Sequence, residues 1–365
     1  MRKRSWDRWP TYSAAARRDV VRLVRDGARL TALRANIIEG LGPRPGSWAC
    51  RVEQLAASQT YRRAIACVNG TVALEAAIRA LPLPINSRIA TTAFTFSATA
   101  AAILNAGHRP VFCDVDPLTM VLSSKTIPDD VAAVVPVDLF GRPCQGPWPV
   151  PCVQDASQAV GSDGAGCYAP GDVVTWSFNG RKNVPAGEGG MVLTADAEIE
   201  RRLRLRLSHG ENFDSPDVGT NGHLHEVAAC LAWHGLMSVA RRNAVRQARA
   251  RQLNRLLAGL PVQLPDPTDH AFYVYPVILD AGVDRDRLVR VFTRLGVHSQ
   301  PGYIQPPIHR YPAFAGCERR VLPVTEELSM KTLLLLPTQI TSATTRQDIL
   351  WLAARVRAAF SALGT

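Results

Sequence analysis

Hydrophobic positions along the chain follow two spacings, one typical of buried strands and one typical of helices. Short apolar runs predict strands at residues 64–68, 88–91, 110–113, 132–137, 150–154, 173–176 and 191–193. The segments between them predict helices at residues 72–81, 97–106 and 196–207. Strands and helices that alternate in this way imply a mostly parallel sheet covered by helices on both faces.

Helices are also predicted before and after this alternating region, at residues 13–39, 48–57 and 224–259. A further strand and two helices then indicate a second, smaller domain, at residues 272–279, 285–295 and 344–363. We therefore expect an α/β protein with a mostly parallel central sheet and a small α+β domain. Its expected parts are an N-terminal helical segment at 1–60, a large α/β domain at 61–245 and a C-terminal domain at 246–365.

The turn after the first strand is a candidate phosphate site. Asn69, Gly70 and Thr71 connect the strand at 64–68 directly to the helix at 72–81. At such a turn the free amide groups and the positive end of the helix dipole both point at an anion. Because Asn and Thr are also ordinary helix caps, this turn by itself fits either role.

A lysine occupies a comparable position after a later strand. The chain holds only four lysines, Lys3, Lys125, Lys182 and Lys331. All its other basic residues are arginines. Lys182 lies between the apolar run at 173–176 and a glycine-rich turn at 187–190, which places its amine in a loop at a strand end. Lysine can lose its proton and attack a carbonyl, whereas arginine in effect cannot. The alternative is an ordinary surface lysine. The adjacent Arg181 would favour the neutral amine, since a nearby positive charge lowers a lysine pKa.

Two further side chains lie where a cofactor ring would be held. Asp155 ends the strand at 150–154, and ligands of parallel sheets bind beyond the carboxyl ends of the strands. The alternative role for Asp155 is a helix N-cap. Phe94 and Phe96 precede the helix at 97–106, where aromatic residues either enter the core or lie flat on a cofactor ring.

These groups together match the needs of one cofactor. A lysine amine can form a Schiff base with an aldehyde, and a carboxylate can keep a pyridine nitrogen protonated so that the ring draws electrons. A helix N-terminus and a serine hydroxyl can hold a phosphate, and an aromatic side chain can stack on the ring. Pyridoxal 5'-phosphate (PLP) requires all four.

The spelling and order of several segments resemble the DegT/DnrJ/EryC1/StrS aminotransferase family. The resemblance runs from about residue 9 to near the C-terminus. The matching stretches are residues 68–74, 95–99, 107–116, 154–159 and 177–190. Several specific motifs in the same order carry much more weight than any one of them.

The resemblance implies a PLP-dependent enzyme of fold type I, usually a homodimer with its sites at the subunit interface. Lys182 is similar to the lysine that bonds to the cofactor and later moves a proton, and Asp155 to the partner of the pyridine nitrogen. The remaining implied cofactor contacts are Gln158 beside the ring hydroxyl, Phe96 stacked on the ring, Gly70, Thr71 and Ser177 at the phosphate, and Asn221 reaching the phosphate from the neighbouring subunit.

The implied reaction takes an amino group from glutamate or glutamine and gives it to a keto-sugar, a cyclitol ketone or a related cyclic ketone. The cofactor alternates between PLP and pyridoxamine phosphate. The opening residues 9–12 resemble those of secondary-metabolism branches of the family that act on cyclitols or make aminohydroxybenzoate. This resemblance implies a pathway such as antibiotic biosynthesis. The same scaffold also supports dehydratases and aminohydroxybenzoate synthases, and a non-catalytic regulator that binds PLP is a third interpretation.

The chain departs from the family at two places that bear on substrates. Asp138 stands where the family often has His, before a Leu-Phe-Gly segment. Asn221, Gly222 and His223 stand where the family often has Asn-Tyr-Arg, so an arginine near the interface site is missing. The substrate candidates are Tyr303, His309 and Asp138.

The composition of the chain argues against several classes of binding partner. The net charge is +11 (42 basic minus 31 acidic residues), carried mainly by arginine. No aromatic residues are interleaved with the basic segments and no reading motif is present, so nucleic-acid binding is not expected. The eight cysteines are scattered without metal spacing, so no metal is expected, and they indicate a reduced cytoplasmic protein. We do not expect the basic start to be a signal peptide, since no apolar stretch follows it, nor do we expect an apolar run that crosses a membrane.

Overall fold

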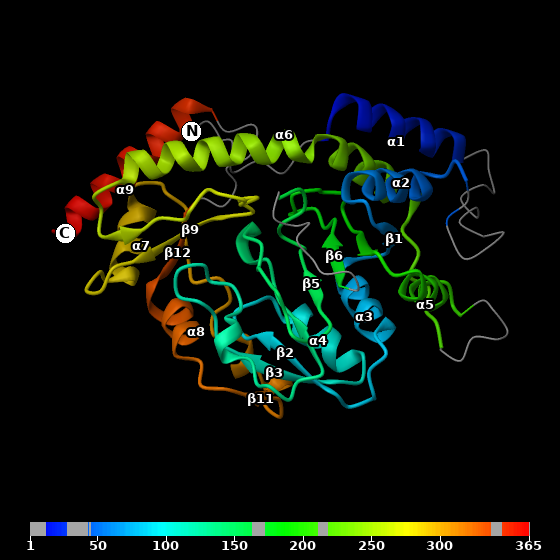
Figure 1. The fold of residues 1–365 in the computed structure, drawn as a ribbon. Helices are drawn as coiled ribbons and strands as arrows, with labels where there is room; N and C mark the ends of the chain where they lie inside the picture. Colours follow the sequence, from blue (N-terminus) through cyan, green and yellow to red (C-terminus); the bar gives the residue numbers. More distant parts are fainter. Residues whose placement is uncertain are drawn as a thin grey trace.

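The computed structural model describes residues 12–27, 43, 45–162, 172–210, 218–336 and 345–364. Its centre is a sheet made of two four-stranded halves, in the order β1-β7-β6-β5 and β4-β2-β3-β11 (Figure 1). The strands are β1 (Arg63–Cys67), β2 (Arg88–Thr92), β3 (Arg109–Cys113), β4 (Ala133–Val135), β5 (Val153–Asp155), β6 (Val173–Ser177), β7 (Gly190–Thr194) and β11 (Glu318–Arg319).

Parallel bridges join the two halves where β4 meets β5, between Val134 and Cys152 and between Val137 and Asp155. Among the described strands of this sheet, β7 alone runs antiparallel to both of its neighbours. The predicted mostly parallel sheet is therefore confirmed. The carboxyl ends of β5 and β6 lie side by side, because these two strands pair in parallel.

Alternate residues of the strands pack on opposite faces of the sheet. In β1, Ile65 and Cys67 face a core formed with α3, α4 and α5, whereas Ala64 and Ala66 face a core formed with α2 and α6. Side chains that alternate in this way are what the period of two in an extended chain dictates. The covering helices are α2 (Trp48–Thr60), α3 (Gly70–Ala80), α4 (Ser97–Asn105), α5 (Ala197–Leu207) and α6 (Glu226–Leu257), with α1 (Ala14–Gly27) packed on α6.

A single 32-residue helix, α6, occupies the region where more than one helix was expected (Figure 1). The glycine in its middle, Gly235, does not interrupt it. A Cβ at Gly235 would lie 2.7 Å from Cγ1 of Val184, so the glycine lets α6 approach the loop that follows Lys182. The prediction for residues 13–39 is met by α1 as far as residue 27, and residues 28–39 lie outside the described part of the chain.

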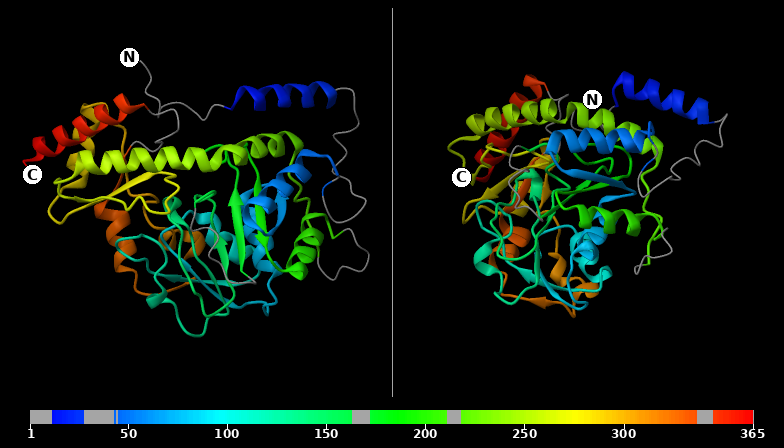
Figure 2. Two further views of the ribbon diagram at one scale, coloured as in Figure 1. Left: turned by 45° about the horizontal axis from the view of Figure 1, so that its top comes forward. Right: turned by 45° about the vertical axis from the view of Figure 1, so that its right-hand side comes forward.

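The C-terminal region forms a smaller antiparallel sheet in the order β10-β12-β9-β8, packed against α7 and α9. Its elements are β8 (Val262–Gln263), β9 (Tyr275–Leu279), α7 (Arg285–Arg294), β10 (Gln300–Pro301), α8 (Pro323–Glu327), β12 (Leu333–Leu336) and α9 (Arg346–Leu363). Both views in Figure 2 show α6 spanning the large sheet and this smaller one. The division at 60 and 245 stays a prediction. Its second boundary falls inside α6, and β11 returns from the C-terminal region to pair with β3.

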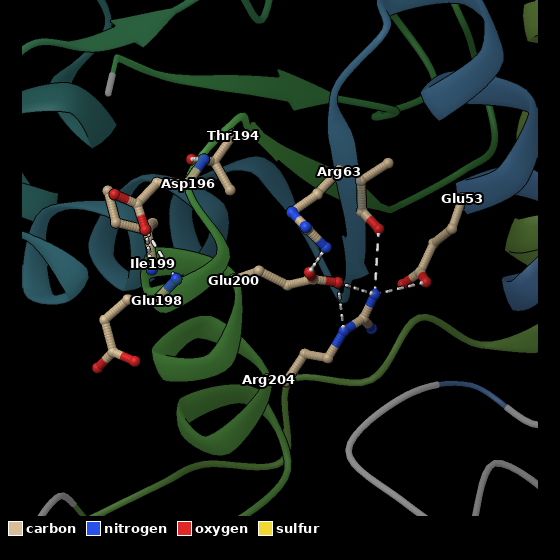
Figure 3. Close-up of polar contacts among 9 residues, drawn as sticks. Glu53, Arg63, Thr194, Asp196, Glu198, Ile199, Glu200 and Arg204 are labelled. Carbon is tan, nitrogen blue, oxygen red and sulfur yellow. Dashed lines mark hydrogen bonds and ion pairs between the residues drawn. The ribbon is translucent and has the colours of Figure 1, made fainter. Parts of the chain in front are cut away.

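An ion-pair network around the buried Glu53 ties α2 and α5 to the edge of the sheet (Figure 3). Arg204 of α5 contacts Glu53 of α2 at 3.2 Å and Glu200 at 3.0 Å. Glu53 also accepts the backbone N–H of Ala66 in β1 at 2.8 Å, and Glu200 pairs with Arg63 at 2.8 Å. None of the described helices is long and apolar enough to cross a membrane.

Candidate active site

A cleft of about 1100 Å³ opens at the carboxyl ends of β5 and β6, between the large sheet and the smaller one. Its walls come from the β1–α3 turn, the start of α4, the loop between β6 and β7, and the chain around β9 and β10. Eight of the predicted site residues line it, namely Gly70, Thr71, Phe96, Asp155, Gln158, Ser177, Lys182 and Tyr303.

The phosphate candidates meet at one corner of the cleft. The Asn69 side chain caps α3 by accepting the backbone N–H of Val72 at 2.8 Å. Ser177 ends β6 directly opposite, and a Cβ at Gly70 would lie 2.8 Å from the Ser177 Cβ. Only glycine therefore allows this approach. Amides of the first helical turn have no acceptor within the helix, so this corner offers an anion both N–H groups and the Ser177 hydroxyl.

Lys182 stands on a loop held by its own backbone. Its N–H donates to the Asn179 carbonyl at 2.8 Å, and Gly180 N–H donates to the Gly187 carbonyl at 2.8 Å. The Asn179 side chain also donates to Glu188 at 2.6 Å. These bonds fix the loop between β6 and β7 and direct the lysine into the cleft.

Burial lowers the pKa of Lys182, and the nearby Asp155 carboxylate opposes that effect. The expected lowering is found, and desolvation of the amine is its leading cause. A contribution from Arg181, whose side chain is exposed, stays a prediction. A lysine with a lowered pKa is more readily neutral and nucleophilic, as carbonyl chemistry requires.

Asp155 is buried, and both of its carboxylate oxygens are fixed. Thr99 Oγ1 donates to Oδ2 at 2.9 Å, and the backbone N–H of Ser157 donates to Oδ1 at 3.2 Å. Thr95 Oγ1 lies 3.1 Å from Thr99 Oγ1. Asp155 thus lines the cleft as a fixed carboxylate that can accept a hydrogen bond from a cationic group. Its bond to Ser157 spans a short turn and caps no helix.

Gln158 is oriented from two sides. Its Oε1 accepts the backbone N–H of Phe140 at 2.8 Å, and its Nε2 donates to the Tyr303 hydroxyl at 3.2 Å. An amide nitrogen has two N–H groups, so one remains for a ligand in the cleft. Phe96, at the N-cap of α4, is 55% exposed and presents its ring to the same space.

Three predicted residues do not line this cleft. Asp138 is fully buried and accepts hydrogen bonds from Cys144 N–H at 2.7 Å and from the Gln154 side chain. His309 is buried against Glu326, with 2.7 Å between Nε2 and Oε1. Asn221 is exposed and bridges to Ser208 on its own chain.

Two cleft residues that contact the predicted side chains were absent from the predicted set. Thr99 lies one helical turn after Thr95, and this spacing at the start of a helix was an available signal. Tyr273 approaches Lys182 from the C-terminal region, with 5.0 Å between Nζ and the ring centroid. The sequence did not indicate Tyr273 because the apolar run predicted a strand from residue 272. In the structure Phe272 has a left-handed backbone (φ 45), and β9 begins only at Tyr275.

The cleft fits PLP on these observations. Gly70 lets the first turn of α3 approach Ser177 closely, so that N–H groups of that turn and the serine hydroxyl lie together, which suits a phosphate. Asp155 can accept from a protonated ring nitrogen, and Gln158 retains an N–H for the ring hydroxyl. Lys182 is the amine within the same cleft.

A sequence profile of the DegT/DnrJ/EryC1/StrS aminotransferase family matches residues 51–354. The chain is 33% identical over 289 residues to the UDP-N-acetyl-3-dehydro-alpha-D-glucosamine 3-aminotransferase of Acidithiobacillus ferrooxidans, which covers 74% of this chain and 77% of that protein. It is 26% identical over 369 residues to the L-glutamine:2-deoxy-scyllo-inosose aminotransferase of Streptoalloteichus tenebrarius, covering 90% and 84%.

The fold also matches a crystal structure of DesI in the presence of its TDP-sugar product. The TM-score is 0.81 at 26% identity, covering 97% of this chain and 92% of that one. The match over residues 51–354 includes every cleft residue described above. The chain therefore belongs to the DegT/DnrJ/EryC1/StrS aminotransferase family and is a PLP-dependent aminotransferase.

Proposed function

We propose that this enzyme moves an amino group from glutamate or glutamine to the ketone of a sugar or cyclitol in a secondary-metabolite pathway. The observation that carries the proposal is the meeting of Lys182, Asp155 and the Gly70–Ser177 corner in one cleft. The relatives support the substrate class, since one is named for a keto-sugar nucleotide and another for a cyclitol ketone and L-glutamine.

Each side chain has a distinct proposed role. Bound PLP supplies an electron sink that stabilises negative charge on the donor's α-carbon. Asp155 holds a proton on the ring nitrogen, Gln158 and Phe96 orient the ring, and Gly70, Thr71 and Ser177 bind the phosphate. The Nζ amine of Lys182 would take the proton from the donor's α-carbon and deliver it to the cofactor carbon. Its lowered pKa suits this work near neutral pH.

The proposal includes a cytoplasmic homodimer in which Asn221 completes the phosphate site of the neighbouring subunit. Two observations support it. Asn221 is exposed and lies outside its own chain's cleft. The carbonyl of the adjacent Gly222 accepts the N–H of Val68 at 2.8 Å, so the segment is anchored beside the phosphate turn. Loss of PLP affinity in Asn221→Ala together with a dimeric mass in solution would support this arrangement, whereas a monomer that binds PLP normally would contradict it.

The direct test is the visible absorption of the purified protein with PLP, recorded before and after adding L-glutamate or L-glutamine. We expect a lysine-dependent band that one donor bleaches, with release of the matching keto acid. Lys182→Ala should lack the band, and Lys125→Ala is the matched control because Lys125 is an exposed lysine elsewhere. A normal band in Lys182→Ala would contradict the assigned role.

The acceptor is tested next, by mass spectrometry of reactions with keto-sugar nucleotides and with cyclic ketones. An aminated product supports transamination. A product that has lost water, formed while neither donor bleaches the band, would favour the dehydratase or aminohydroxybenzoate-synthase alternative. A biological role that survives Lys182→Ala would favour the regulatory alternative.

A further inference from the structure

The aromatic ring of Tyr273 lies beside the amine of Lys182. The 5.0 Å between Nζ and the ring centroid is within the range at which an ammonium is attracted to the negative face of an aromatic ring. Tyr273 lines the cleft and is largely shielded from water, and burial raises the pKa of its hydroxyl. The ring therefore meets the lysine as a neutral group.

Two residues with a left-handed backbone bring Tyr273 to this position. The backbone N–H of Tyr273 donates to the carbonyl of Phe140 (φ 60) at 2.8 Å, and Phe272 (φ 45) precedes Tyr273 in the chain. Bulky residues rarely adopt such φ values, and strained residues of this kind cluster at functional sites. Here the strain separates two neighbours, because Phe272 enters the core at 1% exposure while Tyr273 reaches the cleft.

The other charged and titratable groups around Lys182 do not act on the amine through the face of a ring, as Tyr273 does. Asp155 at the end of β5 attracts the ammonium. Tyr303 stays neutral, since burial raises the pKa of its hydroxyl as well. On the lysine's own loop, the side chains of Arg181 and Glu188 are exposed. Tyr273 is thus a neutral group that favours the protonated amine by the face of its ring.

We propose that Tyr273 is a positioning residue for Lys182, whose ring holds the Lys182 ammonium while the lysine is not joined to the cofactor. The inference rests on the role of Lys182 in the proposed function. A lysine that carries a proton between two carbons has to stay within reach of both. A ring face fixes the ammonium without offering a basic atom that would take its proton, whereas a second carboxylate would compete for it.

The test uses the full-length protein without cofactor and measures the acetylation of Lys182 by acetic anhydride as a function of pH. Mass spectrometry reads each lysine separately, and the exposed Lys125 and Lys331 serve as internal references. The midpoint of the pH profile gives the pKa independently of how accessible the amine is. Tyr273→Phe keeps the ring face, and Tyr273→Leu removes it.

We expect the midpoint of Tyr273→Phe to match the wild type. In Tyr273→Leu we expect the midpoint to fall, because without the ring the acid dissociation constant of the Lys182 ammonium should rise roughly three- to fivefold. A rise in Tyr273→Leu would mean that the ring only excludes water, and no change would mean that it does not contact the ammonium. Either result overturns the proposal.

Two controls keep the outcome interpretable. Tyr273→Met serves as a second ring-free variant if the leucine variant does not fold, and it should shift the midpoint in the same direction. Failure of the proposed function would be recognised separately, because it would remove the lysine-dependent PLP band in the wild type and leave the acetylation profiles of the cofactor-free proteins as they are.

Discussion

Thr99 donates a hydrogen bond from Oγ1 to Oδ2 of Asp155 over 2.9 Å, so a residue of α4 orients the carboxylate at the end of β5. The other oxygen, Oδ1, accepts the backbone N–H of Ser157. With both oxygens fixed, the carboxylate keeps one orientation toward the cleft. The affinity of the site for PLP should therefore depend on Thr99, a residue whose role is to position Asp155.

Thr99→Val keeps the shape of the side chain and removes the hydroxyl. Leaving a buried acceptor unsatisfied costs about 1–3 kcal/mol, so we expect PLP to bind roughly tenfold more weakly. Quenching of tryptophan fluorescence by added PLP measures the dissociation constant. Thr99→Ser retains the donor and should stay close to the wild type. Weakening in Thr99→Ser with none in Thr99→Val would show that the methyl contacts, and not the hydrogen bond, are what matters.

The lowered pKa of Lys182 predicts how stability without cofactor depends on pH. The unfolded chain has a lysine pKa of about 10.4 and the folded protein a lower one, so between these two values the unfolded state binds more protons. The cost of the buried ammonium is fully present below the folded pKa. It disappears as the pH rises to the unfolded value.

Lys182→Met should accordingly stabilise the cofactor-free protein at pH 7, by about 1.4 kcal/mol for each unit of pKa lowering. The advantage should shrink as the pH approaches 10. Urea unfolding of both proteins at several pH values measures it, with Lys125→Met as the exposed control. A difference between wild type and Lys182→Met that stays constant from pH 7 to 10 would argue against a buried charge.

The parts of the site that follow local rules could be predicted from the sequence. The turn proposed to hold the phosphate is contiguous with β1 and α3, and Lys182 lies in the loop after β6, so spacing and residue type were sufficient to predict where they lie. Tyr273 depends on non-local hydrogen bonds and on the left-handed Phe140 and Phe272, which leave no periodic signal. Likewise Gly235 lies inside the single helix α6 where Val184 approaches it closely, a tertiary contact that a helix propensity does not contain.

Gly70→Ala tests the corner proposed to hold the phosphate. The new Cβ would meet the Ser177 Cβ at 2.8 Å, so α3 or β6 has to shift. We expect PLP affinity to fall by at least tenfold and stability by about 1–3 kcal/mol, as for overpacked cores. Gly180→Ala is the matched control in the next loop, since its nearest contact would be an ordinary 3.7 Å. Similar losses in both variants would point to a general sensitivity of these loops.

The ion pair of Glu53 with Arg204 predicts a non-additive effect on stability. Burial raises the pKa of Glu53, and Arg204 is the main group that opposes this. Arg204→Met leaves the carboxylate buried without its cation, which costs about 3 kcal/mol in comparable sites. Glu53→Leu should also destabilise, since it removes the acceptor of Ala66 N–H and one of the two carboxylates that pair with Arg204.

The double variant should lose less stability than the sum of the single ones, because it removes both charges together. Its urea unfolding at pH 7 completes the double-mutant cycle. Glu198→Gln, at an exposed ion pair on α5, is the control whose stability should stay close to that of the wild type. In Arg204→Met the folded state prefers a protonated Glu53, so its deficit should shrink as the pH falls toward the unfolded value of about 4.3. Additive losses, or a deficit that does not change with pH, would mean that packing rather than charge joins α2 to α5.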